Sequence, residues 1–321
     1  MSAIQQRYTI GRDRGLVVTD EANQRMLRGG GPPCLPSRWI PRHEGWIASP
    51  RLLYRGLCRI LRNVEASIRQ HGGCTTTSNL ADLLKMFDKN AVTKLLLQHE
   101  IPTPNAFAPT SPGHFFKELS RLDWQNPYVK LAYGSNASGI AKIELTESEL
   151  KGFTTVAQIG YRFYNTYKVR WLPEHEITPV LKFLIEEHAT VQSAVEKTKL
   201  DGDDFDVRVV MSGGEVLATV FRASRHPITN LHLGGYRADA DRCRKLIPKR
   251  SWADAMEICR QAASLFETAT AGIDLAFDRR TFEPTILEIN AFGDFFPRLT
   301  DDHGRSVHEL EIASTMKRFG L

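Results

Sequence analysis

The hydrophobic pattern of the chain switches between helical and strand-like periods. Helices are predicted where apolar residues recur at helical spacing, over 51–70, 80–99 with an interruption near Asp88, 112–122, 178–188, 251–269 and the C-terminus. Strands are predicted where β-branched and aromatic residues cluster, at 128–131, through 143, and at 189–196, 205–211, 215–222, 272–278 and 284–289. Short turns at 212–214 and 278–280 join neighbouring strands, so the order predicts an α+β fold with antiparallel sheets.

Residues 1–75 form a region of different character. They contain one strand candidate, Leu16–Thr19, a Gly/Pro turn at 29–33 and the helix at 51–70. The Gly-Gly pair at 72–73 ends that helix, and the Thr/Ser/Asn cluster at 75–79 can cap the next one. We therefore predict an N-terminal region of residues 1–75 and a main domain of residues 76–321.

The positive charge is concentrated in that N-terminal region. Residues 1–75 contain twelve Arg, no Lys and five acidic residues, whereas the net charge of the whole chain is +5. Arg55, Arg59 and Arg62 recur at helical spacing, opposite the apolar positions Leu53 and Leu57. This arrangement favours a solvated helix face over a nucleic-acid-binding surface.

Composition favours a globular cytoplasmic protein. The chain is 42% hydrophobic and 25% charged, and no apolar stretch approaches the length of a membrane helix or a signal peptide. The five cysteines, Cys34, Cys58, Cys74, Cys243 and Cys259, show no CxxC spacing. Reduced, mostly buried thiols are therefore expected in place of zinc ligands or disulfides.

The strands at 272–278 and 284–289 carry candidate metal ligands. Alternate residues of a strand share a face, so Ile273, Leu275, Phe277, Leu287 and Ile289 are expected to point toward the core. Asp274, Glu288 and Asn290 are then expected to share the other face. Two carboxylates and an amide oxygen suit Mg²⁺, which completes its octahedron with water and phosphate oxygens. The alternative is an outer sheet surface that simply faces solvent.

Lys130 lies in a predicted strand that runs into the Gly/Ser loop from Gly134 to Gly139. Glycines allow backbone amides to approach phosphate oxygens, and a lysine in a strand supplies a fixed positive charge. Neither GxxxxGK[ST] nor GxGxxG is present in the sequence. A plain hairpin turn would also explain the glycines.

The order of these motifs resembles the ATP-grasp superfamily, and within it the RimK-type carboxylate-amine ligases, over about residues 78–300. The matching segments are Met86-Phe87-Asp88-Lys89, Ile101-Pro102-Thr103-Pro104, Val129-Lys130, Gly134-Ser135 to Gly139, Phe205-Asp206-Val207-Arg208, Asn230-Leu231-His232 with Gly234-Gly235, Gly272-Ile273-Asp274 and Leu287-Glu288-Ile289-Asn290. The resemblance implies two α+β subdomains that clasp ATP, at about 76–188 and 189–321. Relatives carry a larger preceding domain, so residues 1–75 correspond either to a reduced form of it or to a late start of the chain.

The resemblance also implies site roles. The expected ATP contacts are Lys89, Lys130, Gly134, Ser135, Ser138, Gly139, the hinge residues Gln192, Ala194 and Val195, and Asp206 near the ribose. The expected magnesium ligands are Asp274, Glu288 and Asn290, and the expected groups at the reacting end are Arg208, Arg222 and Asn230. The sequence departs from the RimK-type pattern in two places. The hinge lacks the usual Glu beside Gln192, and the segment after Asn290 lacks the usual Pro-Gly.

Several of these residues could instead have a purely structural role. Lys89 could be a surface lysine at a helix N-terminus, and Arg208 and Arg222 could pair with Asp203 or Asp204 in a surface network. Asn230 and His232 could simply cap a turn.

The implied reaction is ATP-dependent ligation of a carboxylate to an amine through an acyl phosphate, with release of ADP and phosphate. Two alternatives are a kinase that phosphorylates a small molecule and stops, and a non-catalytic ATP-binding partner protein. The expected ligands are ATP, Mg²⁺ or Mn²⁺, a carboxylate-bearing small molecule or peptide, and an amine. Relatives are often homodimers, and neither a membrane nor a nucleic acid is expected as a partner.

Overall fold

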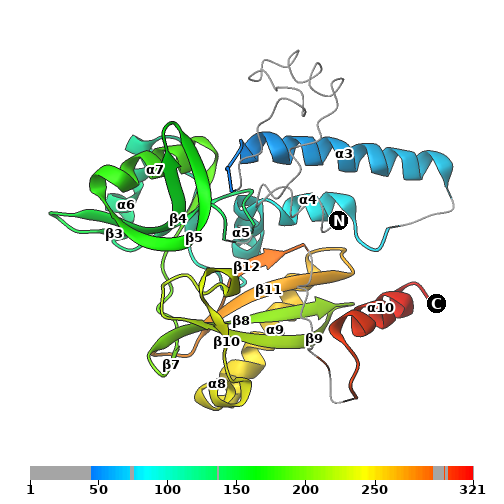
Figure 1. The fold of residues 1–321 in the computed structure, drawn as a ribbon. Coiled ribbons are helices and arrows are strands. Elements are labelled where there is room, and N and C mark those ends of the chain that lie inside the picture. The colour runs from blue at the N-terminus through cyan, green and yellow to red at the C-terminus, as the bar shows by residue number, and fades with distance from the viewer. Residues whose placement is uncertain (1–44, 73–75, 136, 292–299, 301–302, 321) are drawn as a thin grey trace.

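Two antiparallel β-sheets and the helices that cover them build the molecule (Figure 1). The computed structural model describes residues 45–72, 76–135, 137–291, 300 and 303–320. The predicted α+β class with antiparallel sheets is confirmed by this arrangement. The strand candidate Leu16–Thr19 and the turn at 29–33 lie outside the described residues.

The first sheet, at the upper left of Figure 1, has the strand order β1-β6-β2-β3-β4-β5. Its strands are β1 (Ala106–Phe107), β2 (Tyr128–Leu131), β3 (Ile140–Leu145), β4 (Leu150–Ile159), β5 (Arg162–Pro173) and β6 (Ala189–Gln192). Its core includes side chains from α6 (Pro112–Leu122) and α7 (Glu174–Glu186). Strand β6 pairs with β1 and β2, so the chain leaves this sheet after Gln192.

The second sheet lies below the first in Figure 1 and has the order β10-β9-β8-β11-β12, with β7 paired to β8. Its strands are β7 (Lys199–Leu200), β8 (Asp203–Ser212), β9 (Glu215–Ser224), β10 (Tyr236–Arg237), β11 (Thr270–Phe277) and β12 (Pro284–Asn290). One face packs on α9 (Lys249–Ser264) through Phe205, Val207, Val209 and Ile273. The opposite face of β8 carries Asp206 and Arg208, because side chains alternate along a strand.

Short helices connect the two sheets. The core of the second sheet also contains side chains of α4 (Leu80–Met86) and α5 (Lys89–Gln98), which precede the first sheet in sequence. Asn79 caps α4, and Asp88 caps α5 by accepting hydrogen bonds from Asn90 N and Ala91 N. The interruption predicted near Asp88 is thus a helix cap. Further helices among the described residues are α8 (Ala240–Leu246), the 3-10 turn η2 (Leu231–Leu233) and α10 (Val307–Arg318).

The sequence pattern missed the two longest strands of the first sheet, β4 and β5. Strand β5 buries only Leu172, and its other side chains are half-buried or exposed. Without an apolar face, such a strand has little hydrophobic alternation to detect. The helix predicted over 178–188 begins earlier, at Glu174, and the one predicted over 251–269 ends earlier, at Ser264.

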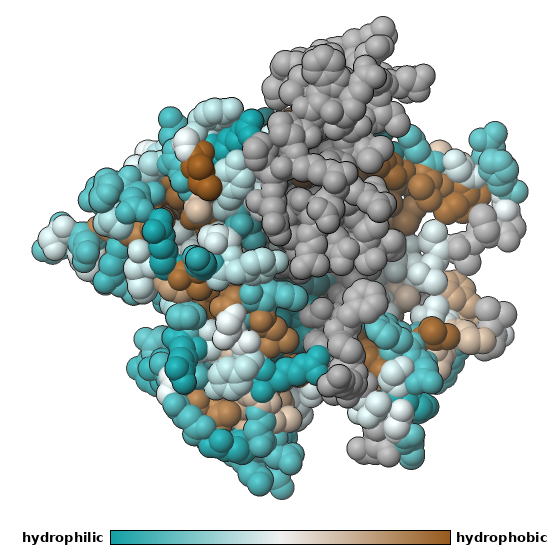
Figure 2. All heavy atoms as spheres, viewed as in Figure 1, coloured by the Kyte–Doolittle hydropathy of each residue, from teal (hydrophilic) through white to brown (hydrophobic). Residues whose placement is uncertain are grey.

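The helix predicted over 51–70 is α3 (Pro50–His71), a long helix at the upper right of Figure 1. Leu57 is buried, whereas Ile60 and Val64 are 53% and 41% exposed. Figure 2 shows hydrophobic surface in the part of the view where α3 lies in Figure 1. None of the helices among the described residues is both long and apolar enough to cross a membrane. Cys243 and Cys259 are free and buried, as expected, while Cys34 and Cys74 lie outside the described residues.

Candidate active site

A cavity of about 580 Å³ opens between the two sheets. Its lining includes all but two of the residues that the sequence singled out as a site, namely Lys89, Lys130, Gly134, Ser135, Ser138, Gln192, Val195, Asp206, Arg208, Arg222, Asn230, Asp274, Glu288 and Asn290. The two that do not line it are Gly139 and Ala194. Segments from both sheets and from α5 therefore converge on one space.

Lys89 is held at the first position of α5 by the Asp88 cap, and its backbone N–H donates to Ala132 O at 3.1 Å. Its Nζ lies 2.9 Å from Glu288 Oε1 and donates to Gly134 O at 2.5 Å. Only 15% of the side chain is exposed. The alternative of a surface lysine is therefore wrong, because Lys89 lies in the cavity and joins α5, the Gly/Ser loop and β12.

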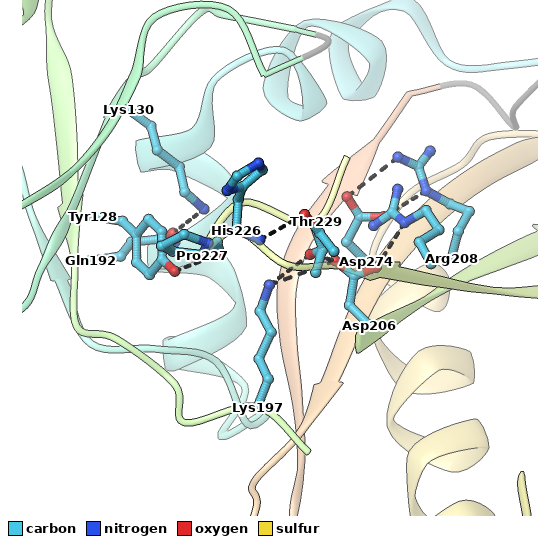
Figure 3. Close-up of polar contacts among 12 residues, drawn as sticks. Tyr128, Lys130, Gln192, Lys197, Asp206, Arg208, His226, Pro227, Thr229 and Asp274 are labelled. Carbon is cyan, nitrogen blue, oxygen red and sulfur yellow. Dashed lines mark hydrogen bonds and ion pairs between the residues drawn. The ribbon is translucent and has the colours of Figure 1, made fainter. Parts of the chain in front are cut away.

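Lys130 points into the cavity because its neighbours in β2, Val129 and Leu131, fill the core on the opposite face. Its Nζ donates to Gln192 Oε1 at 2.7 Å (Figure 3). Burial lowers the pKa of Lys130 to about 8, with Lys89 and Lys197 also lowering it and Glu288 opposing them. An anion that enters the cavity would raise this pKa and so hold the lysine in its charged form.

The Gly/Ser loop closes between β2 and β3 by a turn in which Ser138 N donates to Ser135 O at 2.9 Å. Gly139 adopts a φ of +64°, and a Cβ there would lie 2.1 Å from Leu131 Cδ1. Gly139 therefore lies too close to Leu131 for any side chain, so its contribution is the shape of the loop. Gly134, Ser135 and Ser138 line the cavity, and Asn136 lies outside the described residues.

The hinge is the segment 193–196, between β6 and the second sheet. Ser193 N donates to Asn105 O at 2.9 Å, and Glu196 O accepts from Arg279 N at 2.7 Å, so both ends of the hinge are fixed. Apolar side chains surround the adjacent part of the cavity, namely Pro104, Tyr128, Ile140, Val195, Ile228 and Leu287. This end of the cavity suits a flat, partly apolar group.

The paired strands β11 and β12 bring the candidate metal ligands together. Asp274 lies opposite Glu288, and Asn290 lies opposite Gly272. A β-bulge follows Asp274, so the partner of Leu275 is Ile286. The prediction that Leu287 faces the core is therefore wrong, because Ile286 takes that place and Leu287 lines the cavity.

Asp274 accepts from two arginines (Figure 3). Arg208 Nε lies 2.5 Å and an Arg222 guanidinium nitrogen 2.9 Å from Asp274 Oδ1. Burial alone would raise the pKa of Asp274, but the two guanidinium charges outweigh it, so the net pKa is lowered. The predicted alternative, in which these arginines pair with Asp203 or Asp204 on the surface, is not what the structure shows.

Asp206 continues this charged network toward the hinge. It accepts from Arg222 Nε at 2.7 Å and from the Thr229 hydroxyl, and Lys197 Nζ lies 3.8 Å away. Lys197 Nζ donates to Thr229 Oγ1 at 2.7 Å, and burial lowers its pKa. Lys197 and Thr229 were not predicted as site residues, because no local motif marks them and only the fold brings them beside Asp206.

Asn230 both caps a turn and lines the cavity. Its side-chain oxygen accepts from His232 N at 2.8 Å and caps η2, as the structural alternative proposed. It also lines the cavity, together with His232 and Arg237. Helix α10 adds two further lining residues that the sequence analysis missed, His308 and Glu311.

Oxygen donors for a divalent cation are present at the β11–β12 pair. Asn290 Nδ2 donates to Gly272 O at 3.3 Å, which leaves its carbonyl oxygen as the atom able to ligate. Together with the Asp274 and Glu288 carboxylates, this donor set fits a hard cation that keeps water or phosphate oxygens as its remaining ligands. Among the described residues, no group of three or more His, Cys, Asp or Glu side chains is placed to hold a metal.

The two-sheet architecture, with lysines from α5 and β2 and an acidic β-hairpin around one cavity, is that of an ATP-grasp protein. A protein-family profile described as "YheC/D like ATP-grasp" matches residues 79–299, more than two thirds of the chain. The chain therefore belongs to the YheC/D-like ATP-grasp family. No curated protein matches the sequence.

Solved structures share this fold. D-alanine–D-alanine ligase from Bacillus anthracis has a TM-score of 0.51 and 12% identity, over 79% of this chain and 75% of that chain. The same enzyme complexed with ATP has a TM-score of 0.50 and 13% identity, over 79% of this chain and 74% of that chain. At such identities the likeness concerns the fold alone.

Proposed function

We propose that this chain is an ATP-dependent ligase that joins a carboxylate to an amine through an acyl phosphate. The observation that carries the proposal is the charge arrangement of the cavity. Four cationic side chains and the three oxygen ligands of the β11–β12 pair face one space, namely Lys89, Lys130, Arg208 and Arg222 with Asp274, Glu288 and Asn290. Such a site can bind a polyphosphate together with its metal ion.

ATP would lie along the cavity from the hinge to the arginines. The adenine would lie among the apolar side chains at the hinge, where the backbone groups between Ser193 and Glu196 can read its edge. Asp206 would lie near the ribose. Lys89 and Lys130 would then contact the phosphates, with the Gly134 to Gly139 loop above them.

Phosphoryl transfer would depend on positioning and on charge. Arg208 and Arg222 would hold the γ-phosphate and the substrate carboxylate, and Asn230 would contact the acyl phosphate. Mg²⁺ or Mn²⁺, held by Asp274, Glu288 and Asn290, would neutralise charge on the phosphates. The loop would exclude water, so that an amine rather than water attacks the acyl carbon.

The comparisons support this proposal at the level of the superfamily. Two of the similar solved structures are of a D-alanine–D-alanine ligase, once complexed with ATP, which by its name joins two amino acids. The proposal includes a RimK-type ligase with an N-terminal region of residues 1–75 and a main domain of residues 76–321. It also includes a cytoplasmic location and a homodimer. The proposed carboxylate substrate is a small molecule or a peptide.

The proposal is tested by ADP release from Mg-ATP against pools of amino acids and acidic peptides, with products identified by mass. Glu288→Ala and Lys130→Ala are expected to abolish acceptor-dependent turnover, while Glu283→Ala, an exposed carboxylate before the same strand, is expected to behave as wild type. A condensation product that has lost one water establishes the ligase. A phosphorylated product without an amide would identify a kinase. If neither ATP binding nor turnover occurs, the proposal fails.

A further inference from the structure

Helix α10 borders the cavity through two of its side chains. Val307 at its start packs on Val210 and Val220, and the helix contacts both β8 and β9. In Figure 1 it lies at the right end of the second sheet. Two of its residues, His308 and Glu311, line the cavity. The family motifs end before α10, so this part of the site has no role in the proposed function as stated so far.

The register of the second sheet gives the position of α10 along the cavity. Arg208 lies opposite Asp274 and Val220, and Val210 comes two residues later on the same face of β8. The hinge, by contrast, reaches the sheet near Asp203, at the other end of β8. Helix α10 therefore stands beyond the Arg208–Asp274 pair, on the side away from the adenine end.

We propose that His308, oriented by Glu311, is the general base that accepts a proton from the attacking amine; this rests on the proposed ligase function. The Nδ1 atom of His308 lies 3.3 Å from Glu311 Oε2, and the two side chains are 48% and 18% exposed. A carboxylate at Nδ1 fixes the imidazole with its hydrogen on that atom. The lone pair then lies on Nε2, where it can accept a proton.

The step balances with the groups of the proposed reaction. The amine nitrogen attacks the acyl carbon of the acyl phosphate and forms the C–N bond. The C–O bond to phosphate breaks, and its electron pair leaves with the phosphate. Before the attack, His308 Nε2 takes one proton from the ammonium form of the amine and passes it to solvent. After the C–N bond has formed, the nitrogen loses a second proton to the departing phosphate, which leaves as hydrogen phosphate. Glu311 acts through His308, so it is a positioning residue.

Other charged groups share the surroundings of His308. Glu311 lies on the same helix, and the two strands packed against α10 present Asp206, Arg208 and Arg222 to the cavity. Glu215 at the start of β9 is 74% exposed and faces Arg260 at 3.6 Å.

The test compares two nucleophiles on the same acyl phosphate. Mg-ATP and the pool of amino acids and acidic peptides are given to wild type and to the variants His308→Gln and Glu311→Gln. The control variant is His175→Gln, which changes an exposed histidine of α7. Hydroxylamine, which is largely unprotonated at neutral pH, traps the acyl phosphate as a hydroxamate, and the amide is measured in parallel. His308→Gln is expected to lower amide kcat/KM by about 10²-fold and hydroxamate formation far less.

The outcomes separate the two proposals. Raising the pH should restore amide formation by His308→Gln, because the amine then loses its proton in solution. Glu311→Gln should show a smaller decrease in amide kcat/KM, also restored at high pH. Equal losses of amide and hydroxamate, or an amide rate equal to that of wild type, would overturn the assignment of His308. If wild type forms no hydroxamate from any carboxylate, the ligase proposal itself fails, and the base with it.

Discussion

Lys89 and Glu288, which come from α5 and β12 and both line the cavity, form an ion pair of 2.9 Å. Both residues are partly buried, with side chains 15% and 22% exposed. The proposed function gives each a separate ligand, phosphate for the lysine and a divalent cation for the carboxylate. Because the two ligands differ, the effect of a substitution at Glu288 on ATP affinity is expected to depend on Mg²⁺, whereas the effect of a substitution at Lys89 is not.

Glu288→Gln is expected to bind ATP in the presence of EDTA at least as tightly as wild type, because a negative charge beside the phosphates is removed. It should lose the gain in affinity that Mg²⁺ gives to wild type. Lys89→Met should instead raise the Kd for ATP about tenfold or more in both conditions, since a charged hydrogen bond to phosphate is lost. Isothermal titration of ATP with and without Mg²⁺ measures both effects.

Glu283→Gln is the matched control for Glu288→Gln, because it removes an exposed carboxylate just before β12. It should titrate like wild type. An unchanged response of Glu288→Gln to Mg²⁺ would remove Glu288 from the proposed metal ligands.

ATP affinity should fall as the pH rises through about 8, the pKa of Lys130. Bound phosphate favours the charged ammonium and raises this pKa, so binding takes up a proton wherever the free lysine is neutral. The Kd is therefore constant well below pH 8. Above it, the Kd increases by up to about tenfold per pH unit until the pKa of the bound state is reached.

Lys130→Arg separates this effect from the titration of ATP itself, because arginine stays charged throughout the range. The ratio of wild-type to Lys130→Arg Kd should rise between about pH 7 and pH 9.5, with the inflection set by the lysine. A ratio that does not change with pH would show that Lys130 does not titrate in the nucleotide site.

Asp206→Asn is expected to destabilise the fold, because Asp206 is the buried counter-charge for Arg222 and Lys197. Removing one member of a buried ionic network costs about 3–5 kcal/mol, and the lower end applies here since Arg222 keeps Asp274 as a partner. Urea unfolding measures the loss. The control Asp201→Asn breaks an exposed pair with Arg242 and should leave the urea midpoint unchanged.

The sequence predicted most of the second sheet, because β8, β11 and β12 each have a strongly apolar face and short turns. It also predicted the residues of the cavity on those strands, since alternation determines which side chains share a face. The position of Leu287 was wrong, because the β-bulge after Asp274 shifts the alternation and no sequence feature marks such a bulge.

The remaining parts of the site depend on contacts between distant segments. Lys197 and Thr229 reach Asp206 only because the hinge and the segment after β9 approach the same strand. His308 and Glu311 line the cavity because Val307 packs α10 against β8 and β9. Such contacts carry no local periodicity, so a pattern of hydrophobic and polar positions does not reveal them.

Gly139→Ala should destabilise the protein more than Gly160→Ala, although both glycines have a similar positive φ, +64° and +60°. Both variants incur the cost of about 1–2 kcal/mol for a side chain in the left-handed region. At Gly139 the new Cβ would also lie 2.1 Å from Leu131 Cδ1, whereas at Gly160 it meets nothing within 4 Å. Leu131 is buried in the core of the first sheet, so relieving this clash should add about 1–3 kcal/mol. Free energies of unfolding in urea give the difference directly, and equal losses in the two variants would show that Leu131 moves aside without cost.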